Sequence, residues 1–157
     1  MPTTRNDLPD NTRKAMIALL NARLVDAIDL RLAVKQAHWN VKGPTFIALH
    51  ELFDDIQGRV ATFADDIAER GVALGGMVAG TSQAVAKGTK LPPYPTEIAD
   101  EKEHLKALAD RIGAFGKLAR DAIDTADDAG DRDTADLFTG VSRQMDKDLW
   151  FIEAHLQ

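Results

Sequence analysis

The sequence contains no cysteine, and only 6% of its residues are aromatic. Without cysteine the chain cannot form a disulfide scaffold, a thiolate nucleophile, a Cys-ligated zinc finger or a thiolate-bound iron–sulfur cluster. It also lacks any uncharged hydrophobic run of about 18 residues, and its first residues lack the apolar segment of a signal peptide. We therefore expect a cytoplasmic protein with no membrane partner, in which any metal ion is bound by imidazole and carboxylate groups.

The chain also lacks an excess of basic residues, because 19 Lys and Arg stand against 25 Asp and Glu, for a net charge of -6. An acidic protein is a poor partner for nucleic acid and a better one for cations. The remaining composition, 45% hydrophobic and 28% charged over 157 residues, is that of one ordinary folded domain. We expect a single domain over residues 1–157, with residues 1–9 as an N-terminal tail.

Helical periodicity dominates the sequence, and no segment alternates convincingly with the period of a β-strand. It predicts four long helices, over residues 10–41, 44–70, 96–129 and 133–155. Asp10 is the expected N-cap of the first helix, Pro44 a first-turn residue of the second, and Gly71 the stop after it. Residues 71–95 carry five glycines and three prolines, which predicts a long connection with a short helix at 81–87. The fold class is therefore all-α, a ferritin-like four-helix bundle in which a long crossover joins two antiparallel pairs.

The predicted second helix has an unusual polar face. When each residue is turned by about 100°, four metal-binding side chains share that face: His50, Asp54, Asp65 and Glu69. Only small residues, Gly58 and Ala61 among them, lie between the two pairs, so another helix can pack closely there. Each pair is spaced by four residues and can converge on one ion. The two pairs lie about 16 Å apart, so no single ion contacts both.

The predicted first helix adds a second histidine. Antiparallel pairing about the turn that follows this helix brings His38 level with His50, beside Asp54. Asp65 and Glu69 lie three turns away, so each group is half of a site. A two-fold dimer that lays two second helices antiparallel would join the halves into two equivalent sites. Imidazole and carboxylate ligands suit iron(II), manganese or zinc, and ligand type alone does not choose among them.

Sequence runs along almost the whole chain resemble the Dps proteins, which are miniature ferritins. The most specific run is AHWNVKGPTFIALHELFD at residues 37–54. It is joined by DDIAERGVALGG at 65–76 and TADLFTGVSRQMDKDLWFIEAH at 134–155. By this resemblance five residues are iron ligands, in sites shared across a dimer interface: His38, His50, Asp54, Asp65 and Glu69.

The resemblance implies a function as well as a site. Dps proteins are hollow dodecamers that bind iron(II), oxidise it preferentially with hydrogen peroxide, and store the ferric mineral inside. It also implies that Trp39 lies close to the iron centre, although such a tryptophan is as often simply packing. Acidic residues near the start of the last helix line pores in the family. Seven aspartates are candidates, and most are expected to be solvated: Asp121, Asp124, Asp127, Asp128, Asp131, Asp133 and Asp136.

DNA binding is where the sequence departs from the family name. Residues 1–14 carry three basic side chains, Arg5, Arg13 and Lys14, against Asp7 and Asp10. This is a poor arm for binding phosphate, so we expect weak or absent DNA binding. A DNA-compacting protein for which iron oxidation is secondary stays as the alternative function, and a purely structural helical dimer as a third.

Two other histidines are weaker candidates for chemistry. His104 belongs to a single E-x-x-H spacing, and larger di-iron proteins need two such motifs, so a structural role is expected. His155 lies near the end of the last predicted helix, and its sequence context suggests no partner.

Overall fold

The computed structural model describes residues 3–157, and residues 1 and 2 of the predicted tail lie outside that range. The described residues form five helices and no β-strand beyond one isolated bridge. The helices are α1 (Asp10–Asn40), α2 (Phe46–Ala73), α3 (Ser82–Gly88), α4 (Glu101–Asp128) and α5 (Arg132–Glu153). The predicted all-α protein, with four long helices and a short one in the crossover, is confirmed.

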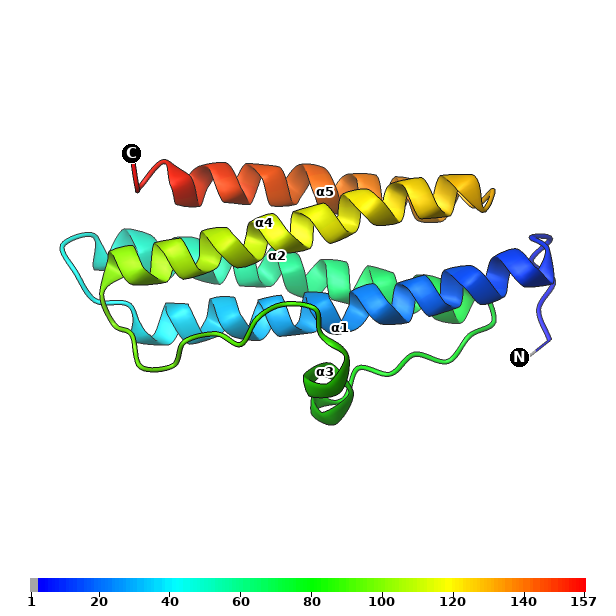
Figure 1. Ribbon diagram of the computed structural model, residues 1–157, viewed down its shortest axis with the longest axis horizontal. Helices are drawn as coiled ribbons and strands as arrows, with labels where there is room; N and C mark the ends of the chain where they lie inside the picture. The colour runs from blue at the N-terminus through cyan, green and yellow to red at the C-terminus, as the bar shows by residue number, and fades with distance from the viewer. Residues whose placement is uncertain (1–2) are drawn as a thin grey trace.

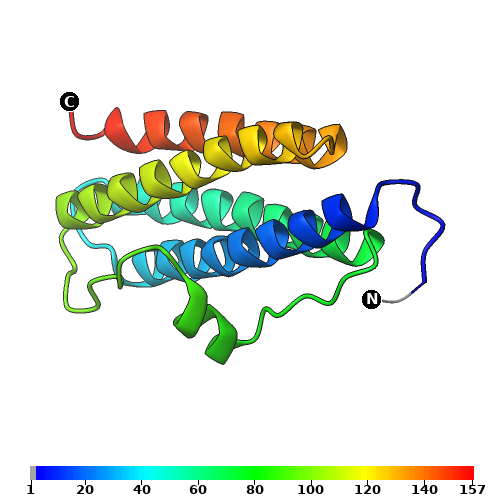
Figure 2. The same ribbon diagram turned by 45° about the vertical axis from the view of Figure 1, so that its right-hand side comes forward.

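The four long helices lie side by side as two antiparallel pairs (Figure 1). α1 packs on α2, and α4 packs on α5. The crossover between α2 and α4 runs back along α1, with α3 set outside the bundle beside that helix (Figure 2). This connectivity is that of a ferritin-like bundle, as predicted. None of the helices of residues 3–157 is long and apolar enough to span a bilayer.

The core lies between the two pairs and is built from apolar stripes at helical spacing. On α1 Met16, Leu20 and Val34 belong to such a stripe and are fully buried. On α5 Leu137 is half-buried against the core, and the neighbouring Phe138 is fully buried. A helix wheel fixes the apolar stripe but not its rotation to within one residue, which depends on how α5 packs against α4.

The N-terminus of α2 differs from the prediction. Pro44 lies in a turn, and the helix begins at Phe46. The Glu101 carboxylate of α4 accepts hydrogen bonds from Thr45 N at 3.0 Å and from Thr45 Oγ1 at 2.8 Å. The turn that leads into α2 is therefore held by a residue 56 positions away along the chain, which local sequence cannot indicate.

The C-terminus of α2 also differs, because the helix passes through Gly71 and ends at Ala73. Gly71 is needed for close packing, since a Cβ there would lie 2.9 Å from Val78 Cγ1 in the crossover. At this end of α2 the residue with a positive φ is Gly75, at 87°. Gly75 makes the turn that ends the helix.

α4 begins later than predicted, at Glu101, so residues 96–100 belong to the crossover. The Asp100 carboxylate accepts from the backbone N–H groups of Lys102 and Glu103 and forms the N-cap. Lys42 N donates to Ala99 O at 2.8 Å, which pairs the α1–α2 turn with the crossover just before that cap. The helix ends at Asp128, before Gly130, as predicted. Smaller corrections are that Pro9, and not Asp10, precedes α1, and that α5 starts at Arg132.

A buried aspartate fixes the segment after α3 to α1. Asp26 is fully buried and accepts from Arg23 Nε at 2.8 Å and from Lys90 N at 2.7 Å. Burial raises the pKa of Asp26, and these hydrogen bonds oppose that shift. Nearby, Thr89 Oγ1 donates to Asp29 at 2.6 Å.

The end of the crossover is held on α4 by a buried aromatic and basic cluster. The Tyr94 hydroxyl lies 2.6 Å from His104 Nδ1, and the Arg111 guanidinium lies 5.0 Å from the centroid of the Tyr94 ring. His104 is 1% exposed, and burial lowers its pKa, so the ring is neutral and its Nδ1 accepts a hydrogen bond from the Tyr94 hydroxyl. This contact supports the structural interpretation of His104.

Candidate metal centre

Two of the five predicted ligands meet face to face. The rings of His38, near the end of α1, and His50, in the second turn of α2, are stacked with centroids 3.7 Å apart and planes inclined by 17°. His38 Nδ1 lies 2.6 Å from His50 O, and His50 Nδ1 lies 2.8 Å from His38 O. The predicted level pairing of these histidines is therefore what the α1–α2 pair adopts.

These reciprocal contacts determine the tautomer of both rings. A carbonyl oxygen only accepts hydrogen bonds, so each Nδ1 must carry the proton and donate it. Each Nε2 then keeps its lone pair and is free to bind a metal ion. The His38 carbonyl lies in the last turn of α1, where carbonyls lack an intrahelical partner, so His50 also caps that helix end.

Asp54 lies one turn beyond His50 and lines the same groove as both histidines. Its carboxylate Oδ1 is 2.6 Å from the ammonium of Lys35 on α1. The hydrogen bond from Lys35 holds the pKa of Asp54 below its usual range, so the carboxyl group is ionised near neutral pH. The three groups at this end therefore offer two imidazole nitrogens and one carboxylate.

Asp65 lies elsewhere, beside a hollow between α1, α2 and the start of the crossover. Small side chains line much of this hollow, including Ala61, Ala64 and Ala68. The Asp65 carboxylate is exposed. The small-residue face predicted on the second helix is thus an open surface of the single chain.

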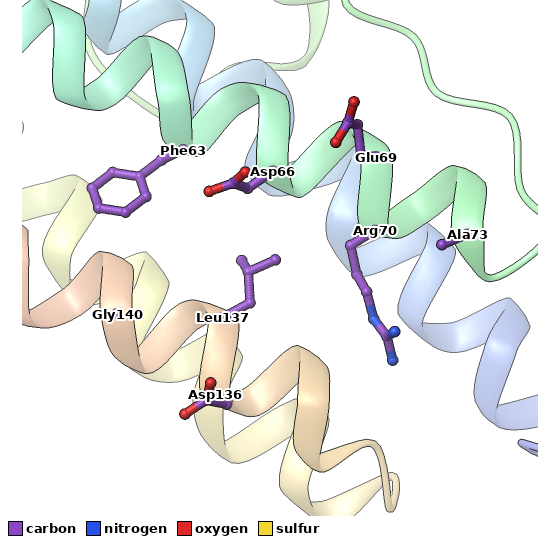
Figure 3. Close-up of a pocket in the computed structure, with 8 residues that line it drawn as sticks. All are labelled: Phe63, Asp66, Glu69, Arg70, Ala73, Asp136, Leu137 and Gly140. Atoms are coloured by element: carbon purple, nitrogen blue, oxygen red, sulfur yellow. The ribbon is translucent and has the colours of Figure 1, made fainter.

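Glu69 is one turn further along α2, also exposed, and lines a groove between α2 and α5 (Figure 3). In that view Asp66 and Asp136 lie on opposite walls of the groove, and Arg70 extends from α2 towards α5. Asp136 is therefore the pore candidate that shares a groove with a predicted ligand.

One chain thus divides the predicted ligands into two groups. His38, His50 and Asp54 share one groove, whereas Asp65 and Glu69 lie about three turns along α2. Within residues 3–157, no three His, Asp or Glu side chains are close enough to hold one ion.

Charged residues elsewhere on α2 hold the two helix pairs together. Arg59 donates to the fully buried Asp148 at 2.7 Å, and Arg70 donates to Asp131 at 2.8 Å. Asp131 also accepts from Thr134 N at 3.0 Å as the N-cap of α5. Among the seven aspartates, Asp131 is therefore a buried structural residue and not a pore candidate.

The remaining predicted residues occupy peripheral positions. Trp39 is 65% exposed, so in the single chain its ring is not packing in the core. His155 Nδ1 lies 2.7 Å from Phe151 O, a partner one helical turn away that the sequence analysis missed. Lys35 was missed as well, although its position three residues before His38 places it on the same face of α1.

The chain was also compared with known proteins. The family model for the ferritin-like domain matches residues 17–157. A DNA protection during starvation protein of Agrobacterium fabrum is 52% identical over 98% of this chain and 95% of its own length. One of Mycolicibacterium smegmatis is 33% identical over 96% of this chain and 81% of its own length.

Solved structures agree with these matches. A Dps structure from Mycobacterium smegmatis superposes with a TM-score of 0.94 at 33% identity, covering 99% of this chain and 95% of that chain. DpsC from Streptomyces coelicolor gives 0.95 at 30% identity, covering 99% and 91%. Sequence and fold therefore agree along nearly the whole chain, and the protein belongs to the Dps family of ferritin-like proteins.

Proposed function

We propose that this protein is a ferroxidase and iron storage protein that oxidises iron(II), preferentially with hydrogen peroxide, at sites shared between two subunits. The observation that carries the proposal is the His38–His50 pair, in which both Nδ1 atoms are fixed by carbonyls and both Nε2 atoms are left as ligands. In the proposed site these join Asp54 of the same chain and the carboxylates at positions 65 and 69 of a second copy.

The chain's own residues would act as follows. The histidines need no tautomeric change to bind iron(II), because the carbonyl contacts already hold the proton on Nδ1. Asp54, whose pKa the Lys35 contact lowers, and two exposed carboxylates supply negative charge that offsets the charge of the ions. The same ligand types bind zinc, which is expected to compete with iron(II).

The shared site suits a two-electron oxidant. Hydrogen peroxide accepts two electrons and two protons to become two water molecules, and two neighbouring iron(II) ions each give one electron. A lone iron(II) gives only one electron and leaves a hydroxyl radical. Holding two ions together thus consumes peroxide without radical release, and the ferric product is stored as mineral.

The proposal is tested by anaerobic iron(II) loading followed by peroxide, with ferric absorbance as the measurement. His50→Ala and Asp65→Ala should each slow the fast phase by about tenfold or more, because each removes a ligand. The matched controls are His155→Ala, near the C-terminus, and Asp110→Ala, on α4. They remove an imidazole and a carboxylate from exposed positions away from the proposed site. Unchanged rapid oxidation in both ligand variants would show that the ligand assignment is wrong.

We further propose that residues 1–157 act as one ferritin-like domain in the cytoplasm and assemble as a dodecamer built from dimers. Light scattering should then give about twelve times the chain mass of 17.1 kDa. A monomer or an isolated dimer would contradict the cage.

We propose that DNA binding is weak or absent at physiological salt. Of the basic residues in the first turn and tail, Arg13 is 8% exposed and donates to Leu8 O and Leu74 O, so it is not available for phosphate. Arg5 and Lys14 remain as exposed cations in this region. A gel shift showing tight, salt-sensitive complexes would favour the alternative function, a chromosome-compacting protein.

A further inference from the structure

The turn between α1 and α2, residues 41–45, is hydrogen-bonded to the start of α4. Lys42 N donates to Ala99 O at 2.8 Å, and Glu101 N donates to Lys42 O at 3.0 Å. One oxygen of the Glu101 carboxylate, Oε2, accepts from both Thr45 N at 3.0 Å and Thr45 Oγ1 at 2.8 Å. The turn of the first helix pair is therefore bonded to residues at the start of the second pair.

The Glu101 side chain also fills the space beside the turn. Gly43 has a φ of 150°, and a Cβ there would collide with the Glu101 carboxylate. Glu101 is half-buried, and the groove that holds His38, His50 and Asp54 is lined by other residues. Glu101 therefore contacts the turn and not the proposed ligands.

The turn joins the two histidines of the proposed site. His38 lies four residues before Lys42, and His50 lies five residues after Thr45. Each histidine donates from Nδ1 to the carbonyl of the other, at 2.6 and 2.8 Å, so the pair depends on how the end of α1 lies against the start of α2. Binding and catalytic sites lose function when their groups shift by about 0.5–1 Å. The bonds from Glu101 act directly on the segment that connects these two helix ends.

We propose that Glu101 is a positioning residue for the iron site, which holds the α1–α2 turn so that His38 and His50 keep the register in which both Nε2 atoms serve as ligands. This inference rests on the proposed function and adds a residue of α4 to the support of the site. Because one carboxylate oxygen accepts both bonds from Thr45, the role needs a hydrogen-bond acceptor and not a negative charge. An amide oxygen at position 101 can accept the same two bonds, whereas a thioether is a weak acceptor.

The inference is tested by metal binding without turnover, using anaerobic cobalt(II) titration of the assembled protein followed by visible absorption. Cobalt(II) accepts the same nitrogen and oxygen ligands as iron(II). Glu101→Met should weaken cobalt(II) binding by about tenfold or more and change the absorption band of the bound ion, because the histidine pair loses its support. Glu101→Gln should retain both the affinity and the spectrum of the wild type.

Asp100→Ala is the matched control. The Asp100 carboxylate accepts from Lys102 N at 3.0 Å and from Glu103 N at 3.3 Å, so it caps α4 without accepting the bonds from Thr45. Like Glu101→Met, this variant should unfold at a lower urea concentration, because it weakens the start of α4. Its cobalt(II) isotherm should match that of the wild type, which separates a loss of stability from a loss of positioning.

A milder pair of variants tests the same contact from the turn. Thr45→Val removes the hydroxyl that donates to Glu101 and should weaken cobalt(II) binding by about threefold, whereas Thr45→Ser keeps a hydroxyl and should bind as the wild type does. If Glu101→Met does not assemble, this pair is decisive, and equal affinity in the two Thr45 variants refutes the inference.

The outcomes separate this inference from the function on which it rests. Weaker binding in Glu101→Met, with wild-type binding in Glu101→Gln and Asp100→Ala, supports the positioning role. If the wild type binds cobalt(II) and Glu101→Met binds it equally well, the role of Glu101 is refuted and the iron site stands. Equal weakening in Glu101→Gln would assign the effect to charge, and equal weakening in Asp100→Ala would assign it to the stability of α4; either result refutes the inference. If the wild type binds no cobalt(II), the proposed function fails as well.

Discussion

The division of the ligands between two ends of α2 predicts that two inactive variants restore activity when they are assembled together. His50→Ala removes a ligand from the histidine end, and a double variant, Asp65→Ala with Glu69→Ala, removes the acidic end. In either homogeneous assembly every shared site lacks one half, so peroxide-driven oxidation should fall by about tenfold or more.

The size of the restoration follows from the symmetry of a two-fold dimer. In a dimer of one chain of each variant, one site combines both defects and the other combines both intact halves. Random assembly of equal amounts makes about half of the dimers mixed, and each mixed dimer has one intact site of two. About a quarter of all sites, and hence about a quarter of the wild-type fast phase, should return.

The assay is ferric absorbance after anaerobic iron(II) loading and peroxide, on subunits mixed in denaturant and reassembled. Co-assembly of His50→Ala with His38→Ala is the control, because two defects at the same end never produce an intact site. If the complementary mixture is no faster than its parents while reassembled wild type is active, sites shared between chains are refuted.

Three further predictions concern stability, each measured by urea unfolding at fixed protein concentration. Because burial lowers the pKa of His104, the unfolded chain binds more protons there below its usual value of about 6.5, so stability should fall as the pH drops through that value. Burial raises the pKa of Asp26, so this residue makes the stability change with pH in the opposite direction at lower pH. The wild type is therefore compared with His104→Gln, which should lose less stability than the wild type between about pH 7 and pH 5.5. Equal losses in the two proteins would argue against a buried, neutral His104. Asp131→Ala should cost roughly 1–3 kcal/mol, since it removes the α5 cap and the partner of Arg70, and a change below about 0.5 kcal/mol would contradict that role. Phe53→Ala, at a fully buried position, should cost roughly 3–5 kcal/mol, whereas a value typical of a surface position would contradict its place in the core.

The helices were predictable because their signals are local. Apolar residues at helical spacing identified α1, α2, α4 and α5, and the glycines and prolines of residues 71–95 identified the crossover. The errors at the two ends of α2 fall where a residue distant in the sequence contacts the boundary. α2 begins at Phe46, after a turn in which Thr45 donates to Glu101, and it passes through Gly71, whose lack of a side chain leaves room for Val78.

The candidate site was predictable to the level of residue faces. Spacing by four residues grouped His50 with Asp54, which line one groove, and the short turn after α1 placed His38 opposite His50. Asp65 and Glu69, which the same spacing grouped, line different hollows of the single chain. Hydrogen-bond partners were not predictable. No periodicity indicates that His104 binds Tyr94, or that the two histidines exchange bonds with each other's carbonyls.

The sequence by itself thus determined which residues share a helix face, because that depends only on the rotation of about 100° per residue. The tertiary structure alone decided the proton positions on His38 and His50 and the ion pair between Lys35 and Asp54. Those features depend on the axial and rotational register of α1 against α2. That register is set by packing of the whole bundle, and a shift of one residue would separate every one of these contacts.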